Sequence, residues 1–165
     1  MTDERHGHGG PLATSLLFDV FALNQAVGRL LANAMRDGPL TPAEYAVYSA
    51  IFELESATPT ALAARLGMRL TTLLDQLRLI EDRGHARRLR HPRDGRSYLV
   101  ALTGTGLEAH RAANRQFEAA YSAFTASLQG GEAAAKRALG LVRDAADAAL
   151  ARESVSPRQP AGRAG

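Results

Sequence analysis

The feature that most constrains this chain is an arginine-rich segment that overlaps two short runs of strand-forming residues. Residues 83–96, RGHARRLRHPRDGR, hold six arginines and one acid, Asp94, for a formal charge of +5, whereas the whole chain carries +3. The runs HARRLR and SYLVAL are strand-prone, and Pro92 and Asp94-Gly95 lie between them, as is typical of a hairpin turn. The sequence predicts a basic β-hairpin, which is either a wing that lies against a phosphate backbone or a solvated surface hairpin.

Length and composition predict one mainly helical domain with extensions at both ends. The chain has 165 residues, and its 45% hydrophobic share suffices for a core, although much of it is alanine, which favours helix and buries little area. The absence of cysteine excludes disulfides, thiolate metal sites and a cysteine redox switch. Because there is no secretory signal and no apolar run of membrane-spanning length, we expect a cytoplasmic protein with no membrane partner.

Both ends of the chain are polar. Residues 1–11 and 152–165 lack apolar periodicity, so we expect two disordered tails. His6 and His8 could supply half of a metal site, but a solvated tail is the simpler interpretation because no further ligand is in view. We therefore expect no metal and no cofactor.

Between the tails the sequence predicts four helices, the hairpin and two further helices. An apolar seam from Leu16 to Ala34 predicts a first helix over about 12–36, which Asp37-Gly38-Pro39 ends. Thr41-Pro42 with Glu44 has the pattern of a capping box that opens the second helix. The apolar face of that helix is expected to comprise Tyr45, Tyr48, Ile51 and Phe52.

The third and fourth helices have the pattern of a helix-turn-helix. Thr58-Pro59 opens a short helix, Gly67 ends it, and a fourth helix follows to about Arg83 with Gly84 as its cap. Such helical pairs are common and often only structural, but a basic hairpin directly after one is a much more specific combination. The expected core residues are Leu62, Leu66, Met68, Leu73, Leu77 and Ile80.

Residues 58–106 carry a set of residues that matches a known family. The matching residues are Leu62-Ala63, Leu66-Gly67, Thr72, Leu77, Glu81, Arg83-Gly84, Asp94-x-Arg96 and Val100-x-Leu102-Thr103-x-x-Gly106. With these residues the segment resembles the winged helix-turn-helix of the MarR family of bacterial transcriptional regulators, and with the flanking helices the resemblance covers about residues 12–150. It implies a homodimer that binds near-palindromic operators and that, in many members, releases DNA when a small molecule binds.

The C-terminal third of the chain carries a seam that needs a partner helix. Ser97 to Leu102 alternates as a half-buried strand should, and Thr103 can cap the next helix. A last helix is expected over about 132–151. The helix that follows Thr103 carries a seam that repeats every 3.5 residues, and nothing in the sequence fixes whether the partner helix belongs to the same chain. Its members are Leu107, His110, Asn114, Phe117, Tyr121, Phe124 and Leu128.

The expected fold is mainly α with a small β-hairpin wing, a winged helix-turn-helix flanked by dimerisation helices. We expect an N-terminal dimerisation helix over 12–37, a DNA-binding domain over 41–102 and C-terminal dimerisation helices over 103–151. This division rests on the resemblance together with the helical periodicity.

The resemblance implies roles for residues of the fourth helix and the hairpin. Thr71, Thr72 and Asp75 match positions that face the major groove, where hydroxyls donate to phosphate or read base edges. Arg96 matches the wing arginine, which suits a narrow, electronegative minor groove. Asp94 either orients the wing by pairing with an arginine or only forms the turn. The further candidate DNA contacts are Arg69, at the start of the fourth helix, and the hairpin residues Arg87, Arg88, Arg90 and Arg93. Strand alternation divides the hairpin residues between its two faces.

The fourth helix departs from the family in two respects. Arg69-Leu70 stands where the family often has Ser-Pro, and losing such a cap costs about 1 kcal/mol. Asp75 is an acid where a basic or neutral residue is common. It either accepts from a cytosine amino group or neutralises an arginine, for which Arg78 has the better helical spacing. Both departures affect operator preference and DNA affinity rather than the fold.

A ligand site is expected between the dimerisation helices and the winged domain, again because the family has one there. Aromatic side chains mixed with a few polar groups suit a small aromatic or phenolic ligand. The same residues are equally consistent with ordinary core, and His110 and Asn114 with a role in helix register. The candidates are Asn24, Arg29, Tyr45, Tyr48, His110 and Asn114.

Motifs of enzymes are not found in the sequence. It has no glycine-rich phosphate loop, no His-Glu metal helix and no nucleophile elbow, and its five histidines are scattered. We expect His85 and His91 to supplement the charge of the hairpin. The sequence therefore predicts a dimeric, sequence-specific regulator, most simply a repressor released by a ligand. The alternative is a helical dimeric interaction module with a degenerate DNA-binding domain.

Overall fold

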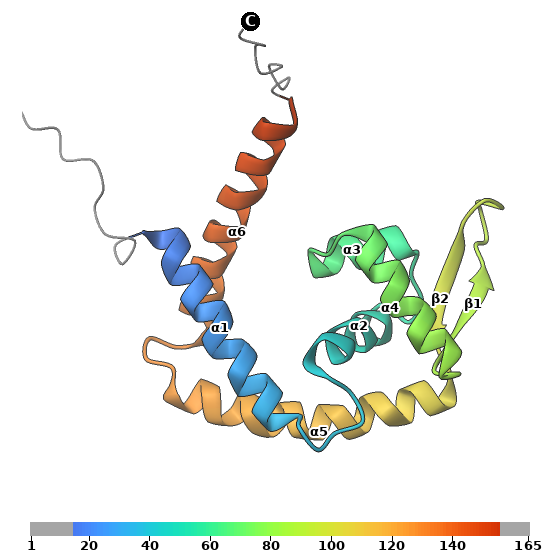
Figure 1. Ribbon diagram of the computed structural model, residues 1–165, viewed down its shortest axis with the longest axis horizontal. Coiled ribbons are helices and arrows are strands. Elements are labelled where there is room, and N and C mark those ends of the chain that lie inside the picture. The colour runs from blue at the N-terminus through green and yellow to red at the C-terminus, as the bar shows by residue number, and fades with distance from the viewer. Residues whose placement is uncertain (1–14, 156–165) are drawn as a thin grey trace, which may run out of the picture. The chain divides into compact units, whose positions relative to one another are not determined.

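The computed structural model describes residues 15–155, which form six helices and a two-stranded antiparallel sheet (Figure 1). The predicted tail over 1–11, with His6 and His8, and residues 156–165 lie outside the described residues. The elements are α1 (Leu16–Ala34), α2 (Pro42–Glu53), α3 (Pro59–Leu66), α4 (Leu70–Asp82), β1 (Ala86–Arg90), β2 (Tyr98–Leu102), α5 (Gly104–Ser127) and α6 (Glu132–Val155).

Two compact units divide the chain within α5, between Tyr121 and Ser122. The first holds α1 to α4, the hairpin and most of α5, and the second holds the end of α5 and α6. The predicted tail from residue 152 begins too early, because α6 continues to Val155. Arg152 stabilises this last turn, since its Nε donates to the Ala148 carbonyl at 3.1 Å, where a cation also favours the helix dipole.

Local sequence signals set the helix boundaries of the first unit. The predicted capping box is confirmed, since the Glu44 N–H donates to Thr41 Oγ1 and the Thr41 N–H donates to Glu44 Oε2. Thr58 caps α3 in the same way, accepting from the Ala61 N–H at 3.2 Å. Gly67 and Gly84 have φ of 63° and 70°, a left-handed conformation that glycine adopts without steric cost.

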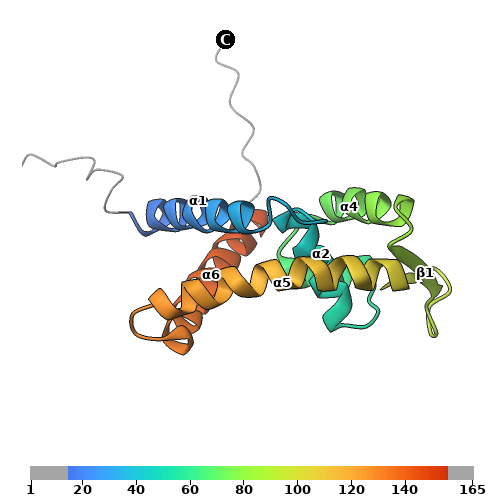
Figure 2. The ribbon, with the colours of Figure 1, turned by 90° about the horizontal axis from the view of Figure 1, so that it is seen from below.

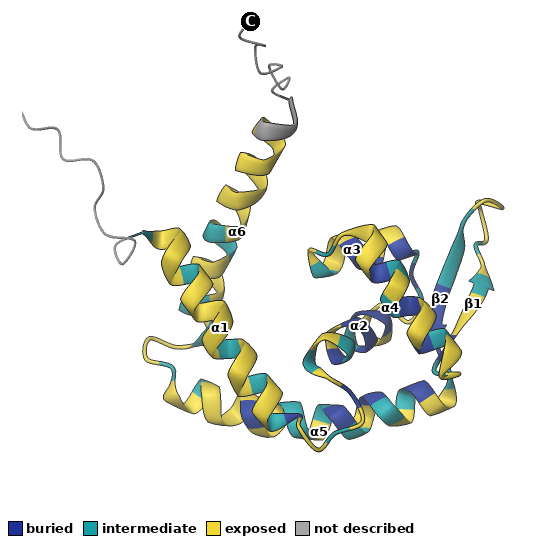
Figure 3. Cartoon of the chain, in the orientation of Figure 1, coloured by how far each residue is buried: buried dark blue, intermediate teal, exposed yellow. Residues whose placement is uncertain are grey.

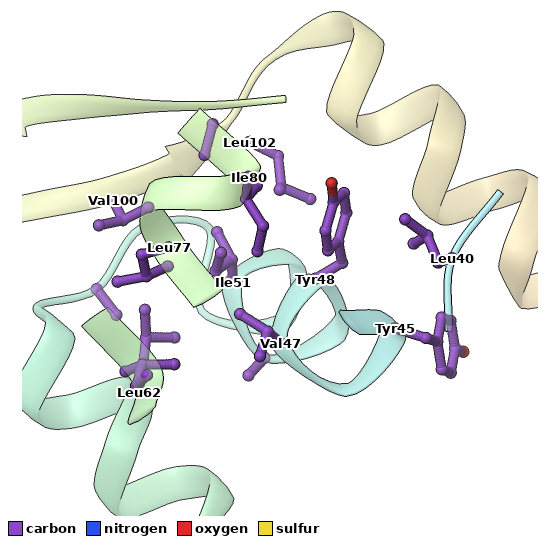
Figure 4. Packing of buried hydrophobic residues seen from close by; sticks show 14 of the residues in the cluster. Leu40, Tyr45, Val47, Tyr48, Ile51, Leu62, Leu77, Ile80, Val100 and Leu102 are labelled. Carbon is purple, nitrogen blue, oxygen red and sulfur yellow. The ribbon is translucent and has the colours of Figure 1, made fainter. Parts of the chain in front are cut away.

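The hydrophobic core lies among α2, α3, α4 and β2 (Figure 4). Its fully buried side chains are Val47, Tyr48, Ile51, Leu62, Leu73, Leu77, Ile80 and Val100. The predicted core of the helix-turn-helix is confirmed except that Leu66 and Met68 are only half-buried. The predicted apolar face of α2 is wrong at Phe52, which is 48% exposed; one face of its ring stacks on His110 in a pocket described below.

The predicted hairpin is confirmed, and its base is part of the core. The register runs from Ala86 opposite Leu102 to Arg90 opposite Tyr98, so residues 91–97 form the connection. In Figure 2 the hairpin extends from the end of α4. A further pair of backbone hydrogen bonds joins Val100 to Ala57, just before α3, and fixes β2 to the helix-turn-helix.

Outside this core, α1 and α6 are largely exposed (Figure 3). None of the α1 residues is buried, and its exposed apolar side chains are Leu16, Leu17, Phe18, Phe21, Leu23 and Leu30. On α6 the exposed apolar side chains are Leu139, Leu141 and Leu150. Among the described helices, none has both the length and the apolarity that a membrane span requires.

Candidate nucleic-acid interface and pocket

The exposed face of α4 carries the residues predicted to face the major groove. Thr71, Thr72 and Asp75 are exposed, while Leu73 and Leu77 on the other side of the helix are buried. The helix begins directly after Arg69, whose side chain makes no capping hydrogen bond, in agreement with the expected loss of a cap.

The acid on this face is paired with an arginine. Arg78 Nη1 lies 2.8 Å from Asp75 Oδ1, and both side chains are about two-thirds exposed, at 67% and 69%. An exposed pair of this kind contributes at most about 1 kcal/mol. The free protein therefore has a weak, easily opened ion pair at the centre of the candidate reading face.

Most of the predicted hairpin arginines are exposed cations. In the part of the chain that the structure describes, no ion pair joins Arg87, Arg90, Arg93 or Arg96 to an acid. Asp94 accepts a hydrogen bond from the Arg96 N–H at 2.9 Å and so shapes the turn. Of the two roles weighed for Asp94, the described residues contain only the turn-forming one.

Arg88 differs from the other hairpin arginines. Its Nε and Nη2 each donate over 2.8 Å to a different oxygen of Glu81 on α4, and its guanidinium lies 4.5 Å from the centroid of the Tyr98 ring. The hydrogen bonds from Arg88 to Glu81 raise the pKa of the guanidinium. Arg88 therefore faces α4, whereas strand alternation turns Arg87 to the other side of β1.

The two histidines of the hairpin segment each have hydrogen-bond partners, and their expected contribution to its charge stays a prediction. The His91 Nδ1 accepts hydrogen bonds from the Arg93 and Asp94 N–H groups at 3.3 and 3.0 Å. The half-buried His85 is joined through Nδ1 to the Tyr48 hydroxyl at 2.8 Å. His91 therefore orders the backbone of the connection between the strands, and His85 joins the start of the hairpin to α2.

An ion pair connects α2 to the end of α4. Glu44 Oε1 lies 2.6 Å from Arg83 Nη1. Burial alone would raise the pKa of Glu44, but hydrogen bonds from the Thr41 backbone and from Arg83 outweigh burial and lower the pKa below its usual 4.5. The N-terminal turn of α2 is thus held against the segment that leads into β1.

A pocket of about 260 Å³ lies between α2 and α5 and has aromatic walls. The His110 ring lies between the rings of Phe52 and Tyr45, with centroid distances of 4.7 and 5.5 Å. The Tyr45 hydroxyl donates to Asn114 Oδ1 at 2.5 Å, and Ser49 Oγ lies 3.1 Å from His110 Nε2. The full lining is Tyr45, Ser49, Phe52, Glu53, His110, Arg111 and Asn114.

Only half of the predicted ligand residues meet in this pocket. Tyr45, His110 and Asn114 line it, whereas Tyr48 is turned into the core. Asn24 and Arg29 are exposed on α1 and do not line it. These three residues therefore do not share this pocket with the other candidates, and the ligand-binding role of all six stays a prediction. Ser49 and Phe52 are not among the predicted ligand residues, although their positions four and seven residues after Tyr45 mark one helical face.

Known transcriptional regulators resemble this chain in sequence and in structure. No protein-family model matches the chain. It is 31% identical over 138 residues to an uncharacterised HTH-type transcriptional regulator of Mycobacterium bovis, covering 82% of this chain and 92% of that protein. The solved structure of a mutant MarR from E. coli, complexed with operator DNA, superposes with a TM-score of 0.69 and 25% identity over 79% of this chain and 96% of MarR. The chain belongs to the MarR family of winged helix-turn-helix transcriptional regulators.

Two further transcriptional regulators extend the comparison. PcaV from Streptomyces coelicolor, solved in complex with its natural ligand, has a TM-score of 0.71 and 28% identity, over 87% of this chain and 99% of PcaV. TtmR of Methylorubrum extorquens is 32% identical over 95 residues, which are 58% of this chain. That match spans 49% of TtmR, about half the length of that regulator. The expected mainly α fold with a hairpin wing is confirmed by these structures.

Proposed function

We propose that this MarR-family protein is a homodimeric repressor that binds a near-palindromic operator. In each subunit, α4 enters the major groove and the hairpin lies along the adjacent minor groove. The observation that carries the proposal is that one compact unit bears both the exposed face of α4 and a hairpin with several arginines that no acid of the described residues pairs. Cations without acid partners are free to neutralise phosphates, which supplies most of the affinity for duplex DNA.

Specificity is assigned to the face of α4 and to the tip of the hairpin. Thr71 and Thr72 are exposed hydroxyls that can reach base edges or phosphates, and Arg69 precedes them at the start of the helix. Arg96 is proposed to enter the minor groove, with its backbone held by Asp94. Arg87, Arg90 and Arg93 are proposed to contact phosphates.

Dimerisation is assigned to the helices outside the DNA-binding domain, over 12–37 and 103–151. Leu17 and Phe21 on α1 are 76% and 59% exposed, and Leu141 on α6 is 73% exposed. Apolar area of this extent is unfavourable in water, and a second copy of the chain would bury it. A near-palindromic operator follows, because a twofold dimer presents two identical reading helices.

The pocket between α2 and α5 is proposed to hold a small aromatic or phenolic ligand. Its walls are the rings of Phe52, His110 and Tyr45, onto which a planar ligand can stack. Release from DNA requires that the ligand binds the free shape of the protein more tightly than the DNA-bound shape. Such a regulator works in the bacterial cytoplasm and needs no enzymatic activity.

The test is binding to duplexes from the intergenic DNA beside its own gene. We expect saturable binding of a dimer, with an affinity that falls steeply from about 50 to 300 mM salt and a preference over random duplexes. Arg96→Ala should weaken binding to the duplex. Arg143→Ala on α6 is the control, because it also removes one arginine but lies outside the proposed contacts with DNA. Absence of binding to any duplex at low salt would favour the alternative, a dimeric interaction module. The observation on the side of this alternative is the Asp75–Arg78 pair, because the pair lowers the positive charge of the exposed face of α4.

A further inference from the structure

Arg88 connects three elements of the proposed DNA-binding unit through one side chain. It projects from β1, meets the last turn of α4 at Glu81 and lies over the ring of Tyr98 on β2. We call these three residues the Arg88 cluster. Glu81 is largely buried within it, its side chain being 19% exposed, whereas Arg88 is 53% exposed. The carboxylate is therefore committed to the arginine rather than shared with solvent.

The hydrogen bonds of the Arg88 cluster fix the orientation of the Arg88 guanidinium. Two parallel hydrogen bonds of 2.8 Å join the edge of the guanidinium to both oxygens of Glu81. Such a bidentate pair fixes orientation as well as distance, and a lysine cannot reproduce it. The face of the same guanidinium lies on an aromatic ring, which a flexible ammonium also holds less well. Arg88 is thus constrained along both its edge and its face.

The cluster is also the outermost polar connection between the hairpin and α4. The base of the hairpin is fixed by the buried Ala86 and Val100 and by the bridge from Val100 to Ala57. Beyond Arg88, the described residues contain no hydrogen bond or ion pair between the hairpin and α4; the contacts of residues 91–97 are within the connection itself. A two-stranded ribbon is only marginally stable without such support.

We infer that Arg88 is a positioning residue that fixes the angle between the wing and the recognition helix, and that it is not a phosphate contact. The inference rests on the proposed operator binding. In the proposed complex, α4 binds in the major groove and the hairpin tip in the adjacent minor groove of the same operator. The two elements must therefore keep a fixed separation for both to reach their sites. Arg88 and Glu81 supply this constraint because their bidentate pair joins the two elements directly.

The two roles predict opposite signs for one substitution. Glu81→Gln removes a negative charge close to DNA and frees Arg88. If Arg88 contacted phosphate, the variant would bind all DNA more tightly. If Arg88 is a positioning residue, Glu81→Gln weakens operator binding by about tenfold and leaves binding to random duplexes unchanged or stronger. Arg88→Lys, which keeps the charge, should show the same loss of operator preference with an unchanged salt dependence.

The matched control is Arg87→Gln, the neighbouring residue on the other side of β1. It removes one unpaired cation, so it should weaken binding to operator and random duplexes alike and reduce the salt slope by about one. Exchanging the pair, with Glu81→Arg and Arg88→Glu together, should recover part of the operator preference that either single change loses. Recovery separates positioning from a general loss of folding, as does an unchanged melting temperature.

The experiment combines binding with two structural measurements on the full-length dimer. Hydroxyl-radical footprints should lose the minor-groove protection of the wing in Arg88→Lys, while methylation interference from α4 in the major groove persists. Amide hydrogen exchange without DNA should become faster over residues 89–99 in Arg88→Lys and Glu81→Gln, and stay unchanged in the core of α2.

Three results would overturn the inference: tighter binding of Glu81→Gln to the operator, a reduced salt slope in Arg88→Lys, or unaltered exchange in the hairpin of both variants. If the wild type binds no duplex, the proposed function fails at that first step. The exchange measurement still decides whether Arg88 positions the hairpin.

Discussion

The hydroxyl of Tyr48 lies 2.8 Å from Nδ1 of His85, so a fully buried side chain of α2 is hydrogen-bonded to the residue that precedes β1. The Glu44–Arg83 ion pair lies on the same side of α2 and holds the neighbouring part of that segment. Tyr45 and Ser49 project from α2 toward α5 instead and line the pocket. One helix therefore contacts the pocket with some of its residues and the start of the hairpin with others.

Removing the Tyr48 hydroxyl should destabilise the protein without changing its fold. Tyr48→Phe leaves His85 Nδ1 without its buried partner, and such a loss costs about 1–2 kcal/mol. Urea unfolding measures the change. Tyr98→Phe is the control, because its ring packs against Arg88 while its hydroxyl makes no described hydrogen bond. In a double-mutant cycle with His85→Ala, the effect of Tyr48→Phe should become smaller; equal effects in both backgrounds would contradict the hydrogen bond.

Gly106 marks a close contact between α5 and the start of the hairpin. A Cβ at this position would overlap the carbonyl oxygen of His85, which is itself fixed by a hydrogen bond from the Thr103 N–H at 2.9 Å. Gly106→Ala should therefore cost about 2 kcal/mol or more, because backbone must move. Gly104→Ala on the same helix meets nothing within 4 Å and should not destabilise. Thermal unfolding of the two variants compares them, and equal melting temperatures would refute the contact.

Glu55 is strained, and the strain can be removed. It is the one described non-glycine residue with positive φ, at 58°, a conformation that costs a side chain about 1 kcal/mol. Glu55→Gly should raise the free energy of unfolding by about this amount. Glu55→Ala retains a Cβ and should give no such gain. If alanine stabilised as much as glycine, removal of the carboxylate and not of the strain would be responsible.

The capping signals show what local sequence could predict. Thr41 with Glu44, Thr58 with Pro59, and the αL glycine Gly67 set helix ends through contacts within a few residues. The hairpin follows from local turn chemistry in the same way. These features needed no knowledge of the tertiary structure, so the element order was predictable.

The errors concern contacts between elements that are distant in sequence. Tyr45 and Tyr48 look alike on a helical wheel, and only the approach of α5 and of β1 decides which one lines the pocket. In the sequence Arg88 looks like any other hairpin arginine, and only the structure shows that Glu81, in the last turn of α4, is its partner. His85 has the same ambiguity, since its partner lies 37 residues away in α2.

His110 should make stability depend on pH. Burial, together with the positive charge of Arg111, lowers the pKa of His110 below its usual 6.5. The unfolded chain therefore binds a proton more readily than the native protein. Well above pH 6.5 the titration of His110 does not affect the free energy of unfolding. As the pH drops below 6.5 the free energy of unfolding falls, until the native pKa of His110 is passed. We expect His110→Gln to lose less stability than wild type between about pH 7 and 5. Identical slopes in urea unfolding across that range would contradict this.

Asp75 offers a test of how α4 meets DNA. Its ion pair with Arg78 is exposed and weak, so the arginine is available to DNA only when the pair opens. Asp75→Asn frees Arg78 and removes a repulsive charge. We expect severalfold tighter binding to all duplexes, with a salt slope larger by about one, because one more cation can displace counterions.

Asp82→Asn is the matched control, since it removes the same charge from an exposed residue of α4 that has no described ion pair. It should strengthen binding much less, because no arginine is released. Selection of preferred sites from random duplexes then separates the two roles of Asp75. An unchanged site preference in Asp75→Asn means that the acid only restrains Arg78. A preference altered at one symmetric pair of positions would instead show that Asp75 accepts a hydrogen bond from a base, because only direct readout is confined to one base pair.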